Sequence, residues 1–161
     1  MNKSFFVLAV FALCLSTGFA QDKKKEASKA IVPEKLNLGR PVSFENDIRD
    51  IMDFNCVACH NVGTPESKLN LEEAATIIKG GKRGAGIIPG QPDKSLVYLA
   101  ASRAKAPHMP PLPNKVEAQA LTPKELGLLR QWIVEGAKAD GDNTGTVVNW
   151  QPIPKSMKAI Y

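Results

Sequence analysis

The chain has 161 residues and a formal net charge of +5, with 43% hydrophobic but only 6% aromatic residues. This length suits one domain with flanking segments. The charge excess is modest and no aromatic residues are interleaved with basic ones, so a nucleic-acid partner is not indicated. We interpret the excess as solvated surface, with mild steering toward an acidic partner as the alternative. This aromatic content is low for a chain that must build its hydrophobic core from its own side chains. A bound apolar group that fills part of the core would explain it.

Residues 1–20 have the pattern of a secretory signal peptide. Lys3 gives the positive start, an apolar run follows over 5–15, and Gly18 and Ala20 place small residues before the expected cleavage after Ala20. The apolar run is short for a bilayer span, which needs about 20 residues; an uncleaved membrane anchor is the alternative. A lipoprotein signal at Cys14 is weaker because Leu13 precedes it. We therefore expect export, to the periplasm of a bacterium.

Three regions follow the signal. Residues 21–40 are polar and lysine-rich and predict a flexible leader. Residues 41–140 form the expected domain, and 141–161, which lack a helical period, predict an extended tail.

The domain is expected to begin with a helix over 43–55. Ser43 is a suitable N-cap. The apolar residues of this stretch recur at helical spacing and form one face: Phe44, Ile48, Ile51 and Met52. The helix leads directly into the next motif.

That motif is Cys56-Val57-Ala58-Cys59-His60, the attachment signature of c-type haem. Each thiol adds across one haem vinyl group to form a thioether, and the adjacent His60 becomes the proximal iron ligand. Three other readings compete with it. Cys56 and Cys59 could belong to a zinc site with His60 and His108, to a dithiol redox site, or to a structural disulfide.

Two further helices are expected over 72–79, ending at Gly80, and over 92–103. The glycine-rich run 80–86 between them lacks a Gly-Lys-Ser/Thr ending and is not a phosphate-binding loop. We interpret it as a flexible loop near the haem edge, where Lys82 or Arg83 could neutralise a propionate.

The proline-rich stretch 106–113 can be neither helix nor central strand. A final helix is expected from the cap Thr122 to about Glu135, with Pro123 at its first position, Glu125 completing a capping box and Gly136 after its end. Gly127 costs this helix roughly 1 kcal/mol relative to alanine. A close crossing against the first helix would justify that cost, and ordinary tolerance is the alternative.

Four side chains are candidates for the sixth ligand of a haem iron: Met52, His108, Met109 and Met157. Met52 lies one turn before Cys56 on the same helix and cannot reach the opposite face, and Met157 lies in the tail. His108 and Met109 remain, both in a loop stiffened by prolines. Thioether ligation raises the potential and suits an electron carrier, whereas bis-histidine ligation lowers it.

Between about residues 42 and 137 the chain resembles class I c-type cytochromes, and most closely the planctomycete-type cytochrome c domain. The shared segments are Phe44-Glu45-Asn46-Asp47-Ile48, Cys56-x-x-Cys59-His60, Leu69-Asn70-Leu71, Gly80-Gly81, Ile88-Pro89-Gly90, Ser95-Leu96, Met109-Pro110-Pro111 and the run 128–136. The resemblance implies a small all-α fold with long loops wrapped around one covalent haem, with the first and last helices packed together. It also implies that Met109, in the Met-Pro-Pro segment, is the distal ligand.

These features predict an exported monohaem cytochrome that carries single electrons and is not an enzyme. Cys56 and Cys59 would hold haem c, and His60 and Met109 would bind its iron. The partners would be redox proteins of unknown identity, and a membrane-associated respiratory partner is compatible. A haem-based sensor or ligand-binding module and a haem subunit of a larger dehydrogenase complex are the alternatives. The sequence does not decide whether His108 replaces Met109.

Overall fold

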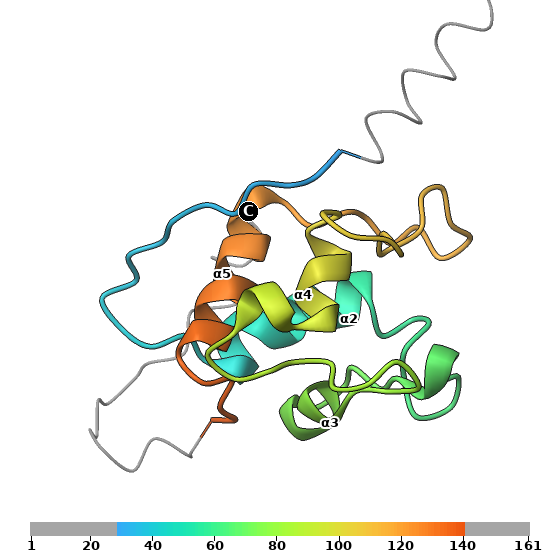
Figure 1. The fold of residues 1–161 in the computed structure, drawn as a ribbon, viewed down its shortest axis with the longest axis horizontal. Helices are drawn as coiled ribbons and strands as arrows, with labels where there is room; N and C mark the ends of the chain where they lie inside the picture. The colour runs from blue at the N-terminus through green and yellow to red at the C-terminus, as the bar shows by residue number, and fades with distance from the viewer. Residues whose placement is uncertain (1–28, 141–161) are drawn as a thin grey trace, which may run out of the picture.

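The computed structural model describes residues 29–140 (Figure 1). Within this range the fold is helical and contains no strand, in agreement with the predicted all-α class. None of the helices in this range is long and apolar enough to cross a membrane. The predicted signal peptide over 1–20 and the tail over 141–161 lie outside the described residues. The elements are η1 (Phe44–Ile48), α2 (Arg49–Asn55), η2 (Glu66–Lys68), α3 (Ala74–Lys79), η3 (Pro92–Lys94), α4 (Leu96–Ala101) and α5 (Pro123–Val134).

The first helical stretch consists of a π-helical turn, η1, that continues into α2. Ser43 caps it as predicted, and its hydroxyl accepts a hydrogen bond from the Asn46 amide at 2.9 Å. Asp140, from the other end of the domain sequence, caps the same helix end. Its carboxylate accepts hydrogen bonds from the amides of Phe44 (2.7 Å) and Glu45 (3.1 Å). An anion is favourable at this positive end of a helix. The two ends of the domain therefore meet where the first helix begins.

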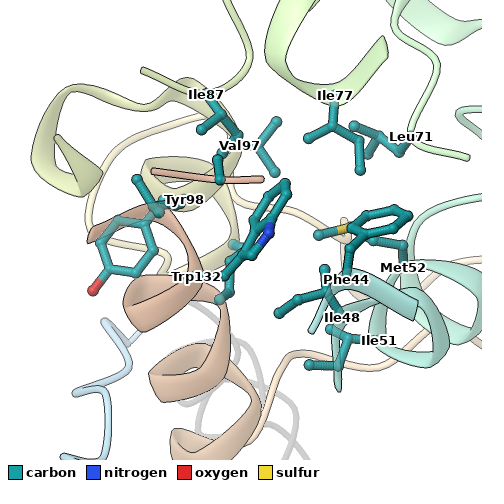
Figure 2. Close-up of a cluster of buried hydrophobic side chains, with 14 of the residues drawn as sticks. Phe44, Ile48, Ile51, Met52, Leu71, Ile77, Ile87, Val97, Tyr98 and Trp132 are labelled. Atoms are coloured by element: carbon teal, nitrogen blue, oxygen red, sulfur yellow. The ribbon is translucent and has the colours of Figure 1, made fainter. Parts of the chain in front are cut away.

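The core joins this first helix to the last. The rings of Phe44 in η1 and Trp132 in α5 lie with centroids 5.5 Å apart and planes tilted by 38° (Figure 2). Both side chains are almost fully buried, together with Ile48 and Met52 from the first helix. The packing of the first helix against the last, which the resemblance implied, is thus observed.

Helix α5 matches its prediction closely. The Thr122 hydroxyl accepts from the Glu125 amide, and the Glu125 carboxylate accepts from the Thr122 amide, which forms the expected capping box. The helix ends at Val134, and Gly136 follows with a φ of +103°. Its apolar face is buried and consists of Leu126, Leu129, Trp132 and Ile133.

The single helix predicted over 92–103 is divided in two. Ser95 has an extended backbone between η3 and α4, and its side chain is fully buried. Its hydroxyl accepts from the Ile88 amide and donates to the Gln91 carbonyl, both at 2.9 Å. These bonds give the buried hydroxyl of Ser95 partners in the preceding turn, and such side-chain bonds to the local backbone compete with a continuous helix. The helix predicted over 72–79 is also shorter than expected. It begins at Ala74, because Glu73 has an extended backbone and serves as the N-cap of α3.

The described part of the predicted flexible leader, residues 29–40, packs against the domain, so that this part of the prediction is corrected. The Ile31 amide donates to the Ser102 carbonyl and the Glu34 amide to the Pro123 carbonyl, both at 2.8 Å. Ile31 and Leu38 are partly buried against the core. In Figure 1 this segment runs in blue along the α5 side of the molecule. We call it the N-terminal segment.

The N-terminal segment also explains Gly127. A Cβ at this position would lie 2.3 Å from the Glu34 carbonyl oxygen. The close neighbour that requires glycine is thus the backbone of the N-terminal segment, and not the first helix as suggested from the sequence.

Candidate functional site

A cavity of about 580 Å³ opens beside α2 and α4. This volume lies within the range of about 300–1,000 Å³ that is typical of small-molecule and cofactor sites. Its walls come from five parts of the chain. They are the stretch 55–60 at the end of α2, the segment 66–71, the glycine-rich loop 81–86, helix α4 and the loop 105–121. In Figure 1 the loops after α2 and after α4 extend on the same side of the helical core.

Both cysteines of the motif line this cavity. The chain leaves α2 in a turn, in which the Cys56 amide donates to the Met52 carbonyl at 2.8 Å and the Cys59 amide to the Cys56 carbonyl at 3.2 Å. This turn brings both thiols to one wall. The two cysteines are free thiols that are partly buried, so the disulfide reading is not supported.

The electrostatics of the motif argue against a dithiol redox site. Burial raises the pKa of the Cys56 thiol to about 12, and the neighbouring Cys59 adds to this effect. Cysteines that act in thiol exchange have a lowered pKa, because the thiolate is the nucleophile. Cys56 is shifted in the opposite direction.

The zinc reading is not supported either. Within residues 29–140 no three or more His, Cys, Asp or Glu side chains are grouped so that they could hold a metal ion. His108, the fourth ligand that this reading needs, does not belong to the cavity lining.

His60 is oriented by the loop that follows it. Its Nδ1 lies 3.1 Å from the Glu66 carbonyl oxygen, and the His60 carbonyl accepts from the Leu71 amide at 2.8 Å. Because a carbonyl can only accept, Nδ1 carries a proton, and in the neutral imidazole the lone pair is then on Nε2. Metal-binding histidines are commonly held in this way by a bond from the other ring nitrogen. His60 is therefore prepared to bind a metal through Nε2.

Met109 lines the cavity from the loop after α4. Its amide donates to the Ala100 carbonyl at 3.0 Å, which ties this loop to the end of α4. Met52 is buried in the core, as expected from its place on the first helix, and Met157 lies outside the described residues. Of the two candidates left open by the sequence, only Met109 is at the cavity.

Parts of the wall were not singled out from the sequence. Asn114 organises the loop that closes one side. Its side-chain nitrogen donates to the carbonyls of Pro111 (3.0 Å) and Ala118 (2.7 Å), and its oxygen accepts from the amides of Val116 (3.1 Å) and Ala118 (3.0 Å). An asparagine after a run of prolines is a turn signal, but the sequence does not reveal that the turn faces a cavity.

Basic residues lie among the apolar lining. Lys82 and Arg83 come from the glycine-rich loop, as predicted, and Lys105 comes from the loop after α4. The glycine-rich loop is hydrogen-bonded, since the Gly81 amide donates to the Gly84 carbonyl at 3.2 Å and the Lys82 amide to the Ser67 carbonyl at 2.8 Å. These cations suit a ligand that carries carboxylates on an otherwise apolar body.

The residues present fit haem c. Two thiols, an imidazole with a free Nε2 and a thioether share one largely apolar cavity that also carries cations suited to propionates. A helical fold with this donor set has the features of a c-type cytochrome domain.

The comparison with protein families agrees. The family model of planctomycete cytochrome C matches residues 56–113, from the first cysteine of the motif past the Met-Pro-Pro segment. This match confirms the resemblance predicted from the sequence and indicates a haem-binding electron carrier rather than an enzyme. Neither the curated proteins nor the solved structures include a match to this chain.

Proposed function

We propose that the protein is an exported monohaem c-type cytochrome that passes single electrons between redox proteins. The observation that carries this proposal is the convergence of Cys56, Cys59, His60 and Met109 on one cavity. Bound haem would supply a one-electron iron couple. The chain's own contribution is to attach, orient and enclose that group.

The roles divide among the cavity residues. Cys56 and Cys59 would form the two thioether bonds, and His60 would bind the iron through Nε2. Met109 would be the second protein ligand of the iron, which suits a carrier because thioether ligation raises the potential. Lys82, Arg83 and Lys105 are the candidates to neutralise the propionates.

The cellular part of the proposal depends on the sequence. The signal peptide pattern over 1–20 supports export to the periplasm. Exposed cations near the cavity would favour a partner with an acidic docking face. A membrane-associated respiratory protein fits this description.

The ligand assignment is tested with Met109→Ala. We expect haem to stay attached, the reduction potential to fall and the iron to bind carbon monoxide at neutral pH, because the iron would lose one of its protein ligands. Redox titration and carbon monoxide difference spectra measure these effects.

His108→Ala is the matched control, because this neighbour does not line the cavity. It should leave both the potential and carbon monoxide binding as in the parent protein. If His108→Ala instead has the effects expected of Met109→Ala, the assignment moves to His108. Carbon monoxide binding by the unmodified protein would favour a sensor over a carrier.

A further inference from the structure

Arg103 is a buried cation just beyond α4 that the proposed function does not use. Its residue is only 6% exposed, and its backbone has a φ of +58°, in the left-handed region that non-glycine residues seldom adopt. Arginine is almost never this buried unless it is paired. Its position therefore calls for a physical reason.

The partners of Arg103 are few. Its Nη1 donates to the Pro110 carbonyl at 3.0 Å, while its buried Nε has no hydrogen-bond partner among the described residues. Arg103 also forms no ion pair within residues 29–140. Burial lowers the pKa of its guanidinium, which nevertheless stays charged at neutral pH. The bond to Pro110 is thus the one polar contact of the guanidinium in this part of the chain.

That bond reaches the residue next to Met109. The Met109 amide donates to the Ala100 carbonyl, and the Pro110 carbonyl accepts from Arg103. The backbone around Met109 is thereby held at two points, by Ala100 at the end of α4 and by Arg103 just beyond that helix. The prolines of this loop have no amide to donate, so the loop depends on such contacts to keep a fixed position.

We propose that Arg103 is a positioning residue that holds the Met109–Pro110 backbone against α4 and so keeps the Met109 thioether at the iron. This inference rests on the proposed function. Outer partners of metal ligands commonly act in this way, by fixing a ligand that they do not themselves bind. Arg103 would govern how readily Met109 is displaced.

The test compares Arg103→Met with Arg103→Lys in the mature holoprotein. Imidazole is titrated into the ferric protein and followed by its visible spectrum. Arg103→Met should bind imidazole about 10- to 100-fold more tightly than the parent, the range typical for loss of an outer partner of a metal ligand. Arg103→Lys keeps the charge but not the planar fork of donors, and should change in the same direction. If Arg103→Met does not fold, Arg103→Lys alone decides.

Arg130→Met is the matched control, since Arg130 is an exposed arginine of α5 outside the cavity lining. It should leave imidazole affinity unchanged. Urea unfolding is measured on every variant. Lower stability with unchanged imidazole affinity in the Arg103 variants would show a merely structural role and overturn the inference.

The near-infrared band of methionine-bound ferric haem separates the two proposals. If the parent protein has this band and the Arg103 variants bind imidazole as the parent does, this inference alone fails. If the parent protein lacks the band, the assignment of Met109 fails and the inference fails with it.

Discussion

At the scale of single residues, short polar side chains determine where the walls of the cavity lie. Ser95 ties the turn before α4 to the start of that helix through Ile88 and Gln91. The helix that it positions contributes Leu96, Leu99 and Ala100 to the cavity lining. A buried hydroxyl with two partners is thus an indirect part of the site.

Ser95→Ala should destabilise the folded protein by about 1 kcal/mol, because it removes the two hydrogen bonds that this buried hydroxyl makes to the Ile88 amide and the Gln91 carbonyl. Urea unfolding of the holoprotein measures the change. A lower midpoint with an unchanged slope would indicate lost stability rather than an altered unfolded state. An unchanged midpoint would contradict the role given to this hydroxyl.

Residues of the site differ in how well the sequence reveals them. The Cys-x-x-Cys-His spacing is local and could be recognised directly, whereas the resemblance was needed to prefer Met109 over His108. The sequence did not indicate Arg103 or Asn114, because what distinguishes Arg103 is its burial and what distinguishes both is their contacts with the loop around Met109. Neither burial nor such contacts can be predicted from a short sequence pattern.

At the scale of elements, the N-terminal segment packs closely against α5. Gly127 admits the Glu34 carbonyl to a place that a Cβ would occupy. Glycine lowers the helix propensity at this position by roughly 1 kcal/mol relative to alanine. This cost accompanies a close contact between α5 and the N-terminal segment that a larger residue would prevent.

Gly127→Ala should destabilise the protein by about 1–3 kcal/mol, the usual cost of overpacking. The same substitution in a variant that lacks residues 29–36 should be neutral or stabilising by up to about 1 kcal/mol, because only the gain in helix propensity remains. Chemical unfolding of the four proteins in this cycle gives the coupling between the two changes. Additive effects would rule out the proposed contact.

Elements with strong local signals could be predicted well. Helix α5 has a capping box, a first-turn proline and a glycine after its end, and these signals act within a few residues. The helix predicted over 92–103 was too long because the buried Ser95 bonds to a preceding turn. The packing of the N-terminal segment was missed because it depends on isolated apolar residues, such as Ile31 and Leu38, that meet the core only in three dimensions.

At the scale of the whole molecule, helices form one wall of the cavity and loops form its other walls. The aromatic pair of Phe44 and Trp132 joins the first and last helices, and the cavity of about 580 Å³ lies beside this core. The low aromatic content of the sequence fits this arrangement, because a porphyrin in the cavity would complete the apolar interior. The helical class was predictable, but the shape of the cavity depends on long loops whose course no periodicity reveals.

The most direct measurement is the intact mass of the exported protein together with its pyridine haemochrome spectrum. The account predicts the mass of residues 21–161 plus one haem, and a spectrum typical of haem whose two vinyl groups are both saturated. Cys56→Ala should impair attachment and leave an unstable chain. A colourless mature protein with the mass of its amino acids alone would contradict the account.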